Sequence, residues 1–133
     1  MSVELVNPPD LAQPVGYSHA AVGRGRFCAL AGQIGWDKNG TLIGDDFVGQ
    51  FEQALSNLLV ALRGARGVPQ DLISLRIYVT DKNRYVAKLK EVGATYRKHL
   101  GKHFPAMSLV QVADLLEPGA LVEIEGLAVI DER

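Results

Sequence analysis

The sequence contains a single cysteine, Cys28, so the chain cannot form an intramolecular disulfide bond. Cys28 lies in the apolar run Phe27-Cys28-Ala29-Leu30, and we expect it to behave as a small buried hydrophobic residue. A chain of 133 residues can bury a core without cross-links. We therefore expect a single domain over residues 1–133.

Long apolar runs are also absent. No run approaches the roughly 18 residues that a membrane-spanning helix requires. The first residues do not combine a basic stretch with an apolar one, as a secretory signal would. These absences predict a cytoplasmic protein with no membrane partner.

The chain has little net charge, with 14 basic against 15 acidic residues and a formal charge of -1. The basic residues are scattered, whereas a nucleic-acid-binding protein needs a basic face. We therefore expect no nucleic-acid partner. His99 and His103 have a spacing that suits a metal on a helix, but Gly101 lies between them and no third ligand is near. We expect neither a metal nor a cofactor.

Hydrophobic periodicity predicts six strands and two helices. A tight hairpin is indicated at Gly23-Arg24-Gly25, and local sequence favours a second at Glu117-Pro118-Gly119. The expected strands cover approximately residues 3–6, 19–23, 26–31, 72–79, 106–112 and 121–130, and the helices cover 46–64 and 83–100.

Each expected helix has one apolar stripe, which in the second helix includes Val86 and Leu89. Both helices should therefore cover the same face of a mixed sheet in an α+β fold. No third helix remains to cover the other face. A second copy of the chain is the simplest cover, so the layers indicate an oligomer.

Two carboxylates, Glu123 and Glu125, share one face of the last strand, since strand side chains alternate. A charged group on an otherwise apolar strand is costly unless it is solvated, paired or used. Glu123 is accordingly a candidate acid/base, and the alternative is a solvated or salt-bridged carboxylate. For Glu125 a structural role is favoured.

Several motifs, in this order and spacing, resemble the YjgF/RidA-like family over nearly the whole chain. The resemblance implies a mixed six-stranded sheet with two helices on one face, a chorismate-mutase-like fold. It also implies that the last strand inserts between earlier ones, with Pro118-Gly119 in a crossover, and a homotrimer with ligand clefts between subunits. The motifs are Leu30-Ala31-Gly32-Gln33-Ile34, Asp46 to Leu59, Ile77-Tyr78-Val79-Thr80-Asp81, Tyr96, Phe104-Pro105-Ala106 and Val122-Glu123-Ile124-Glu125.

Deaminating members of this family add water to a 2-imino acid and release ammonia. By resemblance, Glu123 would hold and polarise the water. The backbone carbonyl of Leu109 would hold it too, and Gly32 would offer its backbone to the pocket. Ala31 stands where the family has a pocket serine. The family's pocket tyrosine corresponds to Tyr17 or Ser18, depending on a one-residue shift.

Met107 occupies the position of the arginine with which the family grips the substrate carboxylate. A thioether cannot make the two charge-assisted hydrogen bonds of a guanidinium. No neighbour is an obvious substitute, and Arg97 belongs to a helix. We therefore expect Met107 and Leu109 to form an apolar wall opposite Glu123, in a pocket that prefers a neutral ligand.

Three functions follow from the resemblance. The first is a hydrolase or deaminase acting on a small imine, enamine or similar metabolite. The alternative is a non-catalytic trimer that binds a small molecule in the same clefts. The second alternative is the ribonuclease activity ascribed to some relatives, which the lack of a basic groove argues against.

Overall fold

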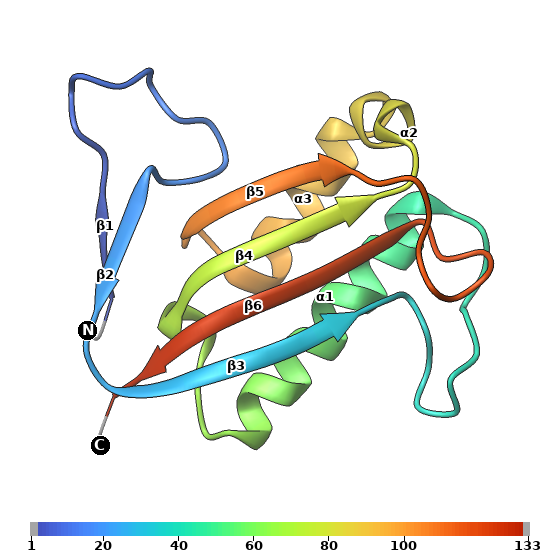
Figure 1. Cartoon of the computed structure of the whole chain (residues 1–133), viewed down its shortest axis with the longest axis horizontal. Helices are drawn as coiled ribbons and strands as arrows, with labels where there is room; N and C mark the ends of the chain where they lie inside the picture. Colours follow the sequence, from blue (N-terminus) through green and yellow to red (C-terminus); the bar gives the residue numbers. More distant parts are fainter. Residues whose placement is uncertain (1–2, 132–133) are drawn as a thin grey trace.

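The computed structural model describes residues 3–131 and contains the expected elements (Figure 1). The second expected helix is divided into two. The strands are β1 (Val3–Val6), β2 (Ala20–Gly23), β3 (Arg26–Gln33), β4 (Leu72–Val79), β5 (Ala106–Gln111) and β6 (Val122–Ile130). The helices are α1 (Phe47–Gly64), α2 (Lys82–Ala87) and α3 (Leu89–Leu100), with a 3₁₀ turn, η1, at Pro69–Asp71.

Four strands form a mixed sheet in the order β3-β6-β4-β5. β4 and β5 are parallel, whereas β6 is antiparallel to both of its neighbours. The last strand therefore inserts between earlier ones, as the family resemblance implied. The hairpin that local sequence favoured at Glu117-Pro118-Gly119 is wrong, because this segment carries the chain across β4 from one side to the other.

β1 and β2 pair with each other in a separate two-stranded sheet. The six expected strands are thus divided between a two-stranded and a four-stranded sheet. An isolated parallel bridge from Ser18 to Ala106 joins the two parts. The pairing of β2 with β1 corrects the hairpin expected at Gly23-Arg24-Gly25. Gly25 has φ +151° and lies so close to the Ile130 backbone that a side chain would collide with it. After this close approach, β3 pairs with β6 and not with β2.

Both long helices cover one face of the four-stranded sheet, as Figure 1 shows. The Asp46 carboxylate caps α1 by accepting a hydrogen bond from the Gly49 N–H at 2.8 Å. The apolar stripe of α1 packs on the sheet and forms the centre of the core. Its buried apolar members are Phe47, Phe51, Ala54, Leu55, Leu58, Leu59 and Leu62.

The expected single helix over residues 83–100 is broken at Lys88, whose backbone angles are not helical. The break turns α2 so that Tyr85 meets the core, with its ring edge-on to Phe47. Val86 and Leu89 were expected to face inward and are instead 57% and 51% exposed. In α3, Val92, Tyr96 and Leu100 are buried as predicted.

Candidate functional site

The strand register divides the expected site residues between two faces of the sheet. Leu75 and Ile77 of β4 are buried beneath the helices, so Arg76 and Tyr78, which alternate with them, point to the uncovered face. Glu123 lies opposite Tyr78 in the register, and Glu125 lies opposite Arg76. Both carboxylates therefore point to the uncovered face.

Glu123 lies directly over Gly32 of β3. A side chain at Gly32 would collide with the Glu123 carboxylate, so a glycine is needed for this approach. The regular pairing of β3 with β6 is interrupted between Leu30 and Gln33, which places Ala31 and Gly32 in an irregular segment. The structure thus brings together three of the expected site residues, Glu123, Gly32 and Ala31.

The two carboxylates differ in their partners. The Glu125 carboxylate accepts a hydrogen bond from the Tyr78 hydroxyl. This contact raises the pKa of the Tyr78 phenol, because the neighbouring carboxylate disfavours the phenolate. Among residues 3–131, no side chain forms a hydrogen bond or ion pair with Glu123. Glu125 is therefore engaged within the sheet, and Glu123 is available to a ligand.

Met107 and Leu109 point to the opposite side. They stand beside Leu75 and Ile77 in the register, and both pack against the core beneath the helices. Within one chain, Met107 therefore does not form a wall facing Glu123. The cleft that the resemblance implies lies between subunits, so Met107 and Glu123 could line it together only if they come from two copies of the chain.

Tyr17 and Ser18 lie beside the start of β5. Of the two hydroxyls, only that of Ser18 forms a hydrogen bond within residues 3–131. Ser18 is 5% exposed, and its hydroxyl donates to the Phe104 carbonyl at 2.6 Å. Tyr17 packs edge-on against His19. Tyr17, Ser18 and Met107 line a hollow of about 310 Å³ beside the bridge between Ser18 and Ala106.

A second cavity, of about 480 Å³, lies between α3 and the edge strand β5. Its wall includes the aromatic side chains of Phe51, Tyr85, Tyr96 and Phe104. The rings of Tyr96 and Phe104 stack with their centroids 5.1 Å apart. Met107 lines this cavity, and so does the guanidinium-bearing side chain of Arg97. Sequence reasoning missed this proximity, because nothing local relates a helix residue to β5. The available signal was Gly93, a glycine inside a helix.

A larger hollow, of about 630 Å³, lies between α1 and the Trp36 loop and contains none of the expected site residues. A polar side chain that lines this hollow forms hydrogen bonds to the Trp36 loop. The Asn57 amide donates to the carbonyls of Ile34 and Trp36 at 3.1 and 2.9 Å, and it accepts from Gln53 at 2.9 Å. This hollow is therefore best explained by the fold.

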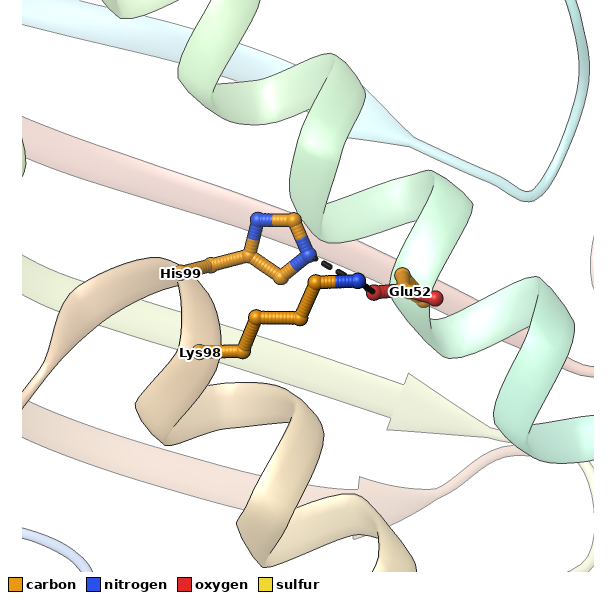
Figure 2. Close-up of polar contacts among 3 residues, drawn as sticks. All are labelled: Glu52, Lys98 and His99. Atoms are coloured by element: carbon orange, nitrogen blue, oxygen red, sulfur yellow. Dashed lines mark hydrogen bonds and ion pairs between the residues drawn. The ribbon is translucent and has the colours of Figure 1, made fainter.

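The histidines near the end of α3 have separate partners. Figure 2 shows the Glu52 carboxylate of α1 contacting both Lys98 and the His99 ring, each at 2.9 Å. These contacts hold the pKa of Glu52 below its ordinary value, because hydrogen bonds from Lys98 and His99 favour the carboxylate. His103 is buried, with its Nε2 2.8 Å from the Leu72 carbonyl oxygen. Within residues 3–131, no cluster of three His, Cys, Asp or Glu side chains could hold a metal.

No helix within residues 3–131 has both the length and the apolar character needed to cross a membrane.

Comparison with known proteins agrees with this architecture. The sequence model of the family described as Endoribonuclease L-PSP matches residues 9–130. A RutC family protein of Pyrococcus horikoshii is 32% identical over 94% of this chain and 96% of its own. A RutC family protein of Drosophila melanogaster is also 32% identical, over 94% of this chain and 88% of its own.

Solved structures show the same relationship. The crystal structure of YyfB, a Rid-family protein of unknown function from Yersinia pestis, is similar with a TM-score of 0.87 and 35% identity. That match covers 98% of this chain and 100% of the other. The crystal structure of RidA from an Antarctic Psychrobacter is similar with a TM-score of 0.68 and 29% identity, over 90% and 92% of the two chains. The chain therefore belongs to the YjgF/RidA family, which also carries the names RutC and L-PSP.

Proposed function

We propose that the protein hydrolyses a small imine or enamine in clefts between the subunits of a homotrimer, with Glu123 as the acid/base. The observation that supports this most directly is the unpaired Glu123 carboxylate over the side-chain-free backbone of Gly32. A half-buried carboxylate without a protein partner is suited to holding a water molecule.

In the proposed reaction, the water oxygen bonds to the imine carbon and the carbon–nitrogen bond then breaks. Glu123 accepts a proton from the attacking water and passes it to the nitrogen, which gives a carbinolamine. The remaining hydroxyl proton then moves through Glu123 to the nitrogen as the carbon–nitrogen bond breaks. The products are a carbonyl compound and ammonia, or an amine if the nitrogen is substituted. The Leu109 carbonyl would help to hold the water.

The division of the site residues between two faces supports the trimer. One half-site, Glu123 with Ala31 and Gly32, lies on the uncovered sheet face, whereas the other, Met107 with Tyr17, lies at the β5 edge. Two different surfaces meet in a head-to-tail contact between copies, and such contacts form a ring, such as a trimer, when the rotation between copies closes. A cleft containing both half-sites therefore needs a neighbouring subunit. Tyr17 fits the family's pocket tyrosine better than Ser18, because the Ser18 hydroxyl is already engaged.

The non-catalytic alternative shares this cleft and differs only in turnover. Ribonuclease activity has weaker support, because Glu123 and Glu125 place two carboxylates on the same sheet face. Their charges would repel a phosphate backbone.

The substitution Glu123→Gln tests the catalytic role. A panel of imines would be generated in the presence of the protein, with hydrolysis followed by ammonia release and loss of the semicarbazone adduct. We expect Glu123→Gln to lower turnover by about 10²- to 10⁴-fold, as for loss of a general acid/base. Ligand binding should be retained.

Glu125→Gln is the matched control, since it removes a carboxylate two residues away on the same face and should leave turnover nearly unchanged. Wild-type protein that binds ligands without turnover would favour the non-catalytic alternative. Equal losses in the two variants would exclude a specific role for Glu123.

A further inference from the structure

The absence of a cation at position 107 led to the expectation of a neutral ligand. That expectation depended on there being no other cation near Met107. The structure places Arg97, one turn from the end of α3, on the wall of the same 480 Å³ cavity that Met107 lines. A positive charge is therefore present at this cavity, although it comes from a different element.

The Arg97 side chain folds back along its own helix toward Gly93. A Cβ placed at Gly93 would lie 3.2 Å from Arg97 Nη1 and 3.9 Å from Cζ. A glycine inside a helix costs about 1 kcal/mol relative to alanine, so such a residue usually has a packing or functional reason. Gly93 does not need a positive φ, and the space above it is taken by the guanidinium. The glycine thus makes room for Arg97 at the cavity.

The guanidinium is also free to bind. Within residues 3–131, no hydrogen bond or ion pair of the Arg97 side chain is found. Lys98, the next residue, is by contrast engaged with Glu52 at 2.9 Å (Figure 2). The rest of the cavity wall is apolar or aromatic and includes Tyr85, Tyr96, Phe104 and Met107. One unpaired cation on such a wall complements a single negative charge attached to an apolar body.

We propose that Arg97 is the carboxylate-binding residue of this cavity and that its ligand is a monocarboxylic acid with an apolar or aromatic body. This inference rests on the proposed function in taking the cavity as part of the ligand cleft. It reverses the expectation of a neutral ligand. Gly93 then acts as a positioning residue, because it admits the guanidinium to the cavity wall.

The test compares phenylglyoxylate with phenylglyoxylamide, two ligands of the same shape that differ in charge. Binding to the full-length protein would be measured by calorimetry and by NMR titration. We expect the acid to bind about 10- to 100-fold more tightly than the amide, as for charge-assisted hydrogen bonds to a guanidinium. Arg97→Met should abolish this preference and leave amide binding unchanged. Arg97→Lys should retain part of it.

Lys98→Met is the matched control, since it removes a charge from the same turn of α3 but not from the cavity, and the preference for the acid should persist. Gly93→Ala provides a second measurement. The added methyl group should reduce the preference for the acid by displacing the guanidinium, while the melting temperature rises because alanine favours the helix. A merely structural role for Gly93 would not couple these opposite changes.

The inference is overturned if the acid and the amide bind equally well to the wild-type protein. It is also overturned if Arg97→Met retains the preference for the acid; in both cases the proposed hydrolase can still be active. Absence of binding by either ligand would overturn the inference and remove the cavity from the proposed function. Acid binding that depends on Arg97, in a protein without imine turnover, would support the inference and reject only the catalytic proposal.

Discussion

Gln50 shows at the scale of one residue how a polar side chain can organise the fold around a site. It is 0% exposed, and its amide nitrogen donates to the carbonyls of Gly44 and Gly119 at 2.7 and 3.0 Å. Its amide oxygen accepts from the Leu121 N–H at 2.8 Å. These bonds hold the start of α1 to the crossover that leads into β6, the strand that carries Glu123.

We expect Gln50→Leu to lower the free energy of unfolding by about 2–4 kcal/mol, because buried backbone groups would lose their partners. Gln53→Leu, on the same helix, is the matched control. It removes a single half-buried hydrogen bond to Asn57 and should cost less than about 1.5 kcal/mol. Urea denaturation of both variants measures the difference. Similar losses would show that the Gln50 network does not stabilise the crossover.

At the scale of elements, α1 and α3 are joined at their exposed edges by Glu52, Lys98 and His99. The side chains of Lys98 and His99 converge on the Glu52 carboxylate, as Figure 2 shows. The Glu52 side chain is 38% exposed, so solvent screens these contacts. The pair of helices therefore depends mainly on its apolar contacts, with a small electrostatic addition.

This addition has a predictable pH dependence. The pKa of Glu52 is lowered in the folded state, so its contribution is complete above the pKa of the unfolded chain, about 4.3. It is lost as the pH falls below that value and through the folded-state pKa. We expect Glu52→Gln to cost up to about 1 kcal/mol at pH 6 and less at pH 3. Chemical denaturation at both pH values tests this.

The double variant Glu52→Gln with Lys98→Met is the control for that comparison. If the contact between the two side chains is responsible, the two single losses should not add. A loss from Glu52→Gln that is independent of pH would contradict the electrostatic explanation.

At the scale of the whole molecule, the helices cover only one face of the four-stranded sheet and leave its other face uncovered in the single chain. Phe27 of β3 is 71% exposed, and Val110 of β5 is 46% exposed. Ala29 and Ala31 are also exposed on β3. Exposed apolar side chains on an uncovered sheet face are typical of a surface that pairs with another chain.

We expect the protein to sediment as a homotrimer at micromolar concentration. Phe27→Glu should shift the equilibrium toward monomer, because it would bury an unpaired charge in the interface. Val22→Glu is the matched control, since Val22 is 57% exposed on β2, outside the four-stranded sheet. A stable wild-type monomer would exclude both the trimer and a cleft shared between subunits.

The sequence alone determined the family, the order of the elements and the inward faces of α1 and most of α3. These features leave a local record, because burial of one helix face places apolar residues three or four positions apart. The motifs around Glu123 and Gly32 were recognised by their resemblance to the family.

Only the tertiary structure decided which strands pair and which site residues meet. The pairing of β2 with β1 and the insertion of β6 depend on contacts between distant segments, such as Gly25 with Ile130. The separation of Met107 from Glu123 follows from the register of β5, β4 and β6 taken together. Arg97 reaches the cavity of Met107 because α3 packs beside the edge of β5, and no spacing along the chain records that proximity.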